Sequence, residues 1–279
     1  MKFKSIFIVL NLTLLVFLTI LILLPLLVMT APFTGSFWQS TWPFVIFLIL
    51  ILIACNAFYF INRRLFLLLE KEDWPALVRY LEDRVIQKGR YSPRLVRLLA
   101  NSYLVLSDSQ SVMSLENKVA LARPALIDAN VLLFGTARIL GKDLSGAVRF
   151  FEVRKGAVKA EGKEWARWYH GFALLLDRRF EKAAVELSVL ARLSKDGIVT
   201  ALSSYFLSGS ITGALPERAA ELRDSWSEGR ERVRKAFPQQ ADWEKEVARL
   251  STEIHVAVLS RYLNEASRWL YESQERNEL

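Results

Sequence analysis

The chain has 279 residues, a formal net charge of +8 and 52% hydrophobic residues. That apolar fraction is high for a water-soluble protein and suggests that some segments lie in a membrane. Because the sequence holds a single cysteine, an intramolecular disulfide is excluded and no oxidising compartment is required.

The N-terminal part of the chain carries two long apolar segments. No charged residue occurs from Ser5 to Asn62, and the stretch TAPFTGSFWQSTWP (residues 30–43) divides this run into blocks of about residues 6–29 and 44–61. Each block approaches the ~20 residues that a helix needs to span the hydrocarbon core. The alternative for the first block is a secretory signal peptide, whose apolar region is typically only ~7 to 15 residues long. The length therefore favours a transmembrane hairpin.

Basic residues flank the outer ends of the two predicted spans. Lys2 and Lys4 precede the first span, the predicted connecting loop over residues 30–43 has no basic residue, and Arg63, Arg64 and Lys71 follow the second span. Because basic flanks are retained on the cytoplasmic side, both ends of the hairpin are predicted to face the cytoplasm. These residues are also suited to contact anionic lipid, at ~1 kcal/mol for each charge near such a surface.

Two further features of the hairpin bear on its packing. Asn11 and Asn56 are the polar residues deepest in the spans, and we expect them to hydrogen-bond within the hairpin or to another subunit. An ion or substrate pathway would call for a charged residue instead. No glycine or proline separates the second span from Trp74, so its helix is predicted to continue out of the bilayer into the first helix that follows.

Beyond the spans, one pattern of small and large residues recurs about every 35 residues. A large residue stands nine positions after the first residue of each window, a small one three further on, and a large one four beyond that. The windows are Gly171, Phe180, Ala183 and Leu187; Gly135, Leu144, Ala147 and Phe151; and, less well matched, Leu65, Trp74, Leu77 and Leu81. A weaker window begins at Ala100. Such spacing lets two helices cross closely, and neighbouring pairs then stack because one pair cannot bury its own apolar face.

This repeat resembles that of the tetratricopeptide repeat (TPR) family, whose unit is about 34 residues of helix-turn-helix. The resemblance covers roughly residues 58–195 and implies an all-α fold. It divides the chain into a transmembrane hairpin (1–62), TPR-like helical repeats (63–207) and a C-terminal helical cap (208–279).

Within the predicted cap, small residues and Pro216 indicate a loop over residues 208–216. Apolar residues at steps of three and four then predict one long final helix, about residues 241–274, that covers the last repeat. A coiled-coil dimer seam is the alternative for this helix.

The sequence holds few residues suited to catalysis or to metal binding. His170 and His255 are the only histidines, and neither has a cysteine or a repeated carboxylate spacing beside it. The stretch from Gly135 to Asp143 fails the phosphate-loop pattern in spacing and in its last residue. We therefore predict no enzyme activity, no cofactor and no metal.

Basic residues cluster between positions 223 and 235, where they could suggest nucleic acid as a partner. They are Arg223, Arg230, Arg232, Arg234 and Lys235. Acidic residues interleave with them, which is typical of a solvated helix with local ion pairs. We therefore predict no nucleic-acid partner.

The repeat phase predicts which residues line the concave face of the solenoid. In one unit these are Arg94, Arg97 and Asn101, and in another they are Trp165, Trp168 and Phe172. Arg97 and Asn101 coincide with the start of the carboxylate clamp of some TPR proteins, but Leu133, Trp165 and Tyr169 at the remaining positions cannot complete it. The predicted groove suits a protein segment that carries an acidic group beside an apolar anchor. Alternatively, the aromatic residues are buried by the next repeat or by the final helix.

Together these features predict a membrane-anchored TPR scaffold that binds a protein or peptide partner at the cytoplasmic face. The layout is similar to that of the two-span bacterial TPR proteins associated with haem biosynthesis, and this similarity implies a bacterial inner membrane. The alternative is a non-catalytic accessory or assembly subunit of a membrane enzyme or of an envelope machine of the secretion or flagellar type.

Overall fold

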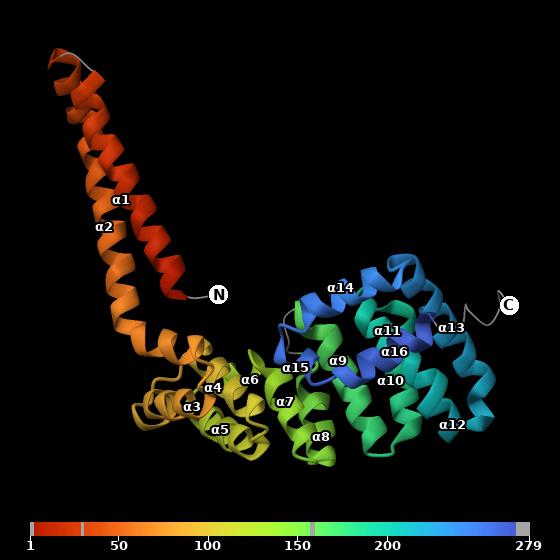
Figure 1. Cartoon of the computed structure of the whole chain (residues 1–279). Helices are drawn as coiled ribbons and strands as arrows, with labels where there is room; N and C mark the ends of the chain where they lie inside the picture. Colours follow the sequence, from red (N-terminus) through yellow and green to blue (C-terminus); the bar gives the residue numbers. More distant parts are fainter. Residues whose placement is uncertain (1–2, 29–30, 157–159, 272–279) are drawn as a thin grey trace. The chain divides into compact units, whose positions relative to one another are not determined.

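A computed structural model describes residues 3–28, 31–156 and 160–271 of the chain (Figure 1). Every regular element within these ranges is a helix, which confirms the all-α prediction. The chain divides into two compact units, Met1–Tyr80 and Leu81–Leu279.

Two long helices form the first unit's apolar hairpin. Helix α1 (Phe3–Val28) lies alongside α2 (Ala31–Glu70), and both are long and apolar enough to cross a membrane (Figure 1). Inside the hairpin Asn56 Nδ2 donates a hydrogen bond to Asn11 Oδ1 (2.6 Å). The rings of Phe7 and Tyr59 also stack, with centroids 3.9 Å apart. The predicted polar contact within the hairpin is therefore present.

Helix α2 is longer than the second predicted span at both ends. It contains Pro43 and almost all of the stretch that was predicted to be a loop over residues 30–43. That prediction is wrong for residues 31–43, because neighbouring helices and local adjustment can compensate for a proline in an apolar helix. Towards its C-terminus α2 continues unbroken to Glu70, as the lack of helix breakers predicted. At 40 residues it is about 60 Å long, roughly twice the thickness of a hydrocarbon core.

The repeats appear as successive helix pairs with closely similar turns. The pairs are α2 with α3 (Trp74–Glu82), α4 (Pro93–Val105) with α5 (Ser109–Ala122), α7 (Val131–Leu140) with α8 (Leu144–Arg154), and α9 (Ala160–Leu176) with α10 (Phe180–Leu193). In every turn one residue that is not glycine adopts the left-handed conformation: Glu72, Ser107, Lys142 and Arg178, with φ of 53°, 58°, 61° and 59°. These positions are 35, 35 and 36 residues apart (107 − 72, 142 − 107 and 178 − 142). The turn therefore repeats with the same period as the side-chain pattern.

An aspartate follows the left-handed residue in three of the four turns and caps the next helix. Asp73, Asp108 and Asp143 each accept a hydrogen bond from the backbone N–H three residues further on, at 3.1, 2.9 and 3.1 Å. Such a cap satisfies one of the backbone donors left free at the start of a helix. This regularity includes the second pair, where the side-chain pattern alone was weak.

The helices of a pair cross closely where the sequence places its small residues. A Cβ atom added to Gly135 would lie 2.0 Å from Phe151 Cζ, and one added to Gly171 would lie 2.9 Å from Leu187 Cδ2. The large residue sixteen positions later therefore lies directly over each glycine. Ala183 is completely buried, but the side chain that meets Gly171 is that of Leu187.

Helical pairing continues past residue 207, where the repeats were predicted to end. Helix α11 (Gly197–Phe206) packs against α13 (Ala219–Ala236), and the chain between them is also helical. It consists of a π-helical turn (η2, Leu207–Ile211), α12 (Thr212–Ala214) and a 3₁₀ turn (η3, Pro216–Arg218). The loop predicted over residues 208–216 is therefore wrong. A Cβ on Gly229 of α13 would lie 2.2 Å from Ser204 Oγ, which shows how closely the two helices approach.

The C-terminal segment forms three helices instead of the predicted single long one. They are α14 (Gln240–Leu250), α15 (Ile254–Ala257) and α16 (Ser260–Tyr271). We call residues 240–271 the C-terminal strap. The break over residues 251–253 lets the chain turn back, so that α15 reaches α4 and α7 while α16 packs on α11 (Figure 1). A single straight helix could not contact both groups of helices. The break therefore allows the strap to bury apolar residues against α4 and α7 and also against α11.

Arginines of α13 bind the C-terminal ends of two helices. Arg232 donates to the carbonyl oxygens of Ala191 and Arg192 at the end of α10, while Arg230 and Arg234 donate to those of Trp269 and Leu270 in α16. Cations are favourable there because carbonyl groups at a helix C-terminus are unpaired and partly negative. Three members of the predicted solvated basic cluster thus fasten the strap and α10 to α13.

Candidate functional site

A cavity of about 670 Å³ lies between the strap and the first helices of the repeats. Its walls come from α4, from the turn before α7 and the start of that helix, from α9, and from the end of α14 with α15. Its charged and polar lining residues are Arg97, Asn101, Asp128, Asn130, Asp196, Arg249, Glu253 and His255. Leu133, Trp165, Leu250 and Val256 contribute apolar surface.

The structure brings together three of the six residues predicted from the concave face. Arg97 and Asn101, one turn apart on α4, line the same cavity as Trp165 of α9. Arg94 is exposed on the same helix but does not line the cavity. Of the predicted basic, hydrogen-bonding end of the groove, Arg97 and Asn101 thus line a cavity and Arg94 does not.

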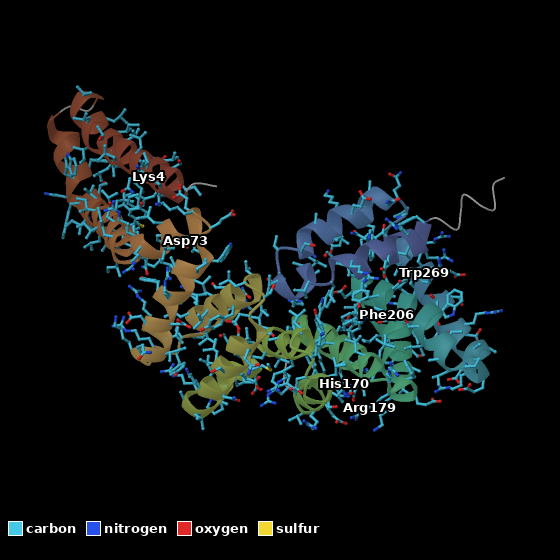
Figure 2. The ribbon with its side chains drawn as sticks, turned by 60° about the horizontal axis from the view of Figure 1, so that its bottom comes forward. Lys4, Asp73, His170, Arg179, Phe206 and Trp269 are labelled. Atoms are coloured by element: carbon cyan, nitrogen blue, oxygen red, sulfur yellow. The ribbon has the colours of Figure 1, made fainter. Side chains whose placement is uncertain are left out.

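The aromatic end of the predicted groove is filled by the protein itself. Trp168 and Phe172 are 0% and 3% exposed, and Phe172 and Phe206 pack against Tyr262 of the strap with ring centroids 5.4 and 5.2 Å away. Figure 2 labels Phe206 on α11 and Trp269 on α16 in this region. The prediction that Trp168 and Phe172 receive a partner is therefore wrong, and the alternative holds: Trp168 is buried by Phe172 and Phe206, and Phe172 by Tyr262 of the strap, which removes their apolar surface from water.

His255 is a buried strap residue that lines the cavity. Its side chain packs against Trp165, with ring centroids 5.3 Å apart, and its backbone oxygen accepts a hydrogen bond from the Tyr169 hydroxyl. Burial, with a smaller effect of the nearby Arg97 charge, lowers the pKa of His255 to about 4. The imidazole is therefore neutral at physiological pH.

Two buried atoms at the cavity lack a hydrogen-bond partner among the described residues. They are Asn101 Oδ1 on α4 and His255 Nε2 on the strap. Buried polar groups are nearly always paired, because leaving one unpaired costs roughly 1–3 kcal/mol. Arg97 likewise forms no ion pair with a described carboxylate, although its charge is close enough to affect His255. Asn101 and His255 thus offer hydrogen-bonding capacity in the cavity that the described residues do not use.

Asp196, an acidic residue of the cavity lining, is already paired. Asp196 accepts hydrogen bonds from the N–H groups of Ile198 and Val199 at the start of α11, and from Trp165 Nε1 at 2.9 Å. Burial raises its pKa above the ordinary value for an aspartate. Asp196 therefore positions Trp165 in the wall and has little capacity left for a ligand.

His170, the other histidine, lies outside the cavity in an ion-pair network. Its Nδ1 is 3.3 Å from Glu186 Oε1, and Lys155 and Arg167 also bind this carboxylate, at 2.5 and 2.7 Å. The hydrogen bond from His170, followed by those from the two cations, holds the pKa of Glu186 well below its usual range. This network joins α8, α9 and α10 (His170 is labelled in Figure 2) and leaves no carboxylate oxygen free for a metal.

Sequence reasoning missed the strap's contribution to the site. His255 stood out only as one of two histidines, and Asp196 was not singled out. The signal that could have located His255 is the short polar stretch Ser251-Thr252-Glu253, which interrupts the apolar stripe. In the described part of the chain, no group of three or more histidine, cysteine, aspartate or glutamate residues could hold a metal ion.

Comparisons with known proteins identify one family. A family model described as "Uncharacterised Treponema protein" matches residues 111–272, more than half of the chain. A protein of Treponema pallidum (strain Nichols), described as "Uncharacterized protein", is 32% identical over 250 residues, which cover 86% of this chain and 79% of the relative. No solved structure matches the chain.

Proposed function

The chain belongs to the Treponema family described above, and we propose that it is a membrane-anchored scaffold of the TPR type. In this proposal the apolar hairpin holds the protein in a bacterial inner membrane, and the repeats face the cytoplasm. There they bind a protein or peptide partner without catalysing a reaction. The basic residues Lys2, Lys4, Arg63, Arg64 and Lys71 would lie on the cytoplasmic side and contact anionic lipid.

The observation that carries this proposal is the repeated turn. Four turns with the same left-handed residue recur at steps of 35 to 36 residues, and the first of them directly follows the long helix α2. Helical pairs with such a period stack into solenoids, which typically use their extended surfaces for protein recognition. An apolar hairpin that continues into the first repeat supports a scaffold located at a membrane.

The cavity is the surface on which we expect a partner segment to bind. Arg97 offers an unneutralised guanidinium, and Leu133, Trp165 and Val256 offer apolar wall. This combination suits a segment that carries an acidic side chain beside an apolar one, because a charge-assisted hydrogen bond and a buried anchor then form together.

In-cell crosslinking of the full chain followed by mass spectrometry tests this proposal. We expect a partner to crosslink reproducibly to residues around the cavity, and to be lost in Arg97→Gln. Arg94→Gln is the matched control, since Arg94 is exposed on the same helix outside the cavity, and it should retain the partner. A partner that is equally abundant with both variants would contradict binding at this site.

A second candidate function is that of an accessory or assembly subunit of a membrane enzyme or envelope machine. It is favoured by the strap, which packs on the aromatic part of the predicted groove and leaves only the cavity open to a partner segment. The same crosslinking experiment separates the two functions. Crosslinks spread over the outer helices α5, α8 and α10, to several proteins of one complex, would favour the subunit.

A further inference from the structure

The cavity has two walls that belong to different parts of the chain, and each wall holds an unpaired buried atom. Asn101 Oδ1 belongs to the repeats, whereas His255 Nε2 belongs to the strap, and both atoms lack a partner among the described residues. His255 is only 7% exposed, so water has little access to it. A ligand that satisfied both atoms would have to contact both walls.

The hydrogen-bonding roles of the three residues define the chemistry of such a ligand. A guanidinium such as that of Arg97 can only donate, whereas an amide oxygen such as Asn101 Oδ1 can only accept. A neutral imidazole nitrogen donates or accepts according to its tautomer. The ligand therefore needs acceptor oxygens, preferably charged, for Arg97, and at least one O–H or N–H donor for Asn101.

The N-terminus of α7 is a second feature of the cavity that favours a negatively charged ligand, beside the guanidinium of Arg97. Val131, Leu132 and Leu133, the first three residues of that helix, all line the cavity. The preceding Asn130 makes no capping hydrogen bond and donates its amide to Leu126 O instead. Backbone N–H groups at an uncapped helix start favour negative charge.

Most of the arginine and carboxylate side chains in the lining already have partners among the described residues. Asp196 is engaged by α11 and Trp165, and Asp128 lies 3.7 Å from Arg154. Arg249 is paired with Glu246, while Glu253 is exposed on the strap. Arg97 is therefore the lining arginine that has no ion pair with a described carboxylate.

We propose that the repeats and the strap together bind one anionic group that carries its own hydrogen-bond donor, and that this binding holds the strap in place. The group is a phosphate that retains a proton, or a carboxylate beside an amide N–H. Arg97 and the start of α7 bind its oxygens, Asn101 accepts from its donor, and His255 contacts it from the strap. The inference rests on the proposed function only in using the same cavity. It adds that the strap forms one of the two walls of the site that binds the partner.

Linkage between ligand and strap follows from this arrangement. A ligand that touches both walls binds the docked strap more tightly than an undocked one, so it must shift the equilibrium towards docking. The ligand should slow hydrogen exchange of the strap amides by a factor of one plus the ratio of ligand concentration to dissociation constant. A partner segment that supplies the anionic group would thereby fix the strap over the repeats.

Hydrogen exchange of the full chain in lipid nanodiscs tests the proposal, with four small anions as probes. Inorganic phosphate and N-acetylglycine carry both an anionic oxygen and a donor, and they represent the phosphate and the carboxylate source. Sulfate and acetate are their counterparts without a donor at neutral pH. We expect phosphate or N-acetylglycine to slow exchange of the α15 amides about tenfold at ten times its dissociation constant. Sulfate and acetate at equal ionic strength should have a much smaller effect.

Variants then test which residues bind the probe. Arg97→Gln and Asn101→Leu should abolish the protection, and Arg94→Gln should retain it. If Asn101→Leu does not fold, Asn101→Asp keeps the side-chain shape and should also abolish protection, because a carboxylate repels the anion. Equal protection by sulfate and phosphate, protection that survives Arg97→Gln, or no protection by any probe would each overturn the proposal. A partner crosslinked through the cavity without anion-dependent protection would leave the scaffold function standing and reject the role of the strap.

Discussion

Phe151 lies directly over Gly135 where α7 and α8 cross, so close that a Cβ atom on the glycine would be 2.0 Å from Phe151 Cζ. Phe151 is itself completely buried and stacks on Tyr169 of the next helix pair, with ring centroids 5.6 Å apart. The ring therefore has no room to move aside. This contact links the crossing within one repeat to the packing between repeats.

We expect Gly135→Ala to lower the free energy of unfolding of the full chain by about 1–3 kcal/mol, because overpacking forces the helices apart. Gly171→Ala should cost less, since the added methyl group would meet the flexible end of Leu187 at 2.9 Å. Gly213→Ala is the control, as nothing lies within 4 Å of its Cβ position. Urea unfolding followed by tryptophan fluorescence measures all three, and equal midpoints for Gly135→Ala and Gly213→Ala would refute the crossing.

The turn between α9 and α10 has the same backbone as its predecessors but lacks their aspartate. Arg179 has φ −90° and ψ 61°, close to the −82° and 66° of the capping residue Asp143. We expect Arg179→Asp to add the missing cap and to stabilise the chain by about 1 kcal/mol, whereas Asp143→Ala should destabilise it by a similar amount. Thermal unfolding should shift in opposite directions for the two variants. A decrease in stability for both would mean that the fourth turn differs from the others.

Burial of His255 makes stability depend on pH in a defined window. The unfolded imidazole titrates near its ordinary pKa of 6.5, and the folded one at about 4. Between these values the unfolded chain binds a proton that the folded chain excludes, so the free energy of unfolding falls as the pH falls and levels off below about pH 4. The expected loss between pH 7 and pH 5 is about 2 kcal/mol.

Comparison with His255→Gln isolates this effect, because the glutamine cannot be protonated. We expect the variant to lose about 2 kcal/mol less between pH 7 and pH 5 than the unchanged chain does, in urea titrations at the two pH values. If both proteins lose stability equally over that interval, the imidazole is not buried in the neutral form.

Membrane orientation can be tested with single cysteines in a Cys55→Ala background. Gly35→Cys lies between the two apolar spans, and Leu121→Cys is 90% exposed on α5. The basic flanks predict that an impermeant thiol reagent labels only Gly35→Cys in intact bacterial cells, and labels Leu121→Cys after lysis. Labelling of Leu121→Cys from outside would place the repeats on the other side of the membrane.

Much of the fold could be predicted from local sequence patterns. The apolar spans, the helical class, the continuity of α2 and the 35-residue period depend on interactions between residues close in the chain. The glycines at positions 135 and 171 are recognisable in the sequence as part of a repeated pattern, because the large side chain that packs over each of them belongs to the same helix pair. The repeated turn was less visible, since Glu72, Ser107, Lys142 and Arg178 share a backbone conformation but not a residue type.

The candidate site depended on contacts between residues far apart in the sequence. From the sequence alone, Trp168 and Phe172 were as suitable for a partner's groove as for a core. Only the strap decided between these roles, when its break after Leu250 allowed Tyr262 to reach Phe172 and His255 to reach Trp165. The hydrophobic effect specifies that aromatic surface is buried but not by which segment, because it has no direction. The sequence by itself therefore determined the helix pairs and their period, and the tertiary structure decided which of the predicted groove residues line a cavity and which are buried.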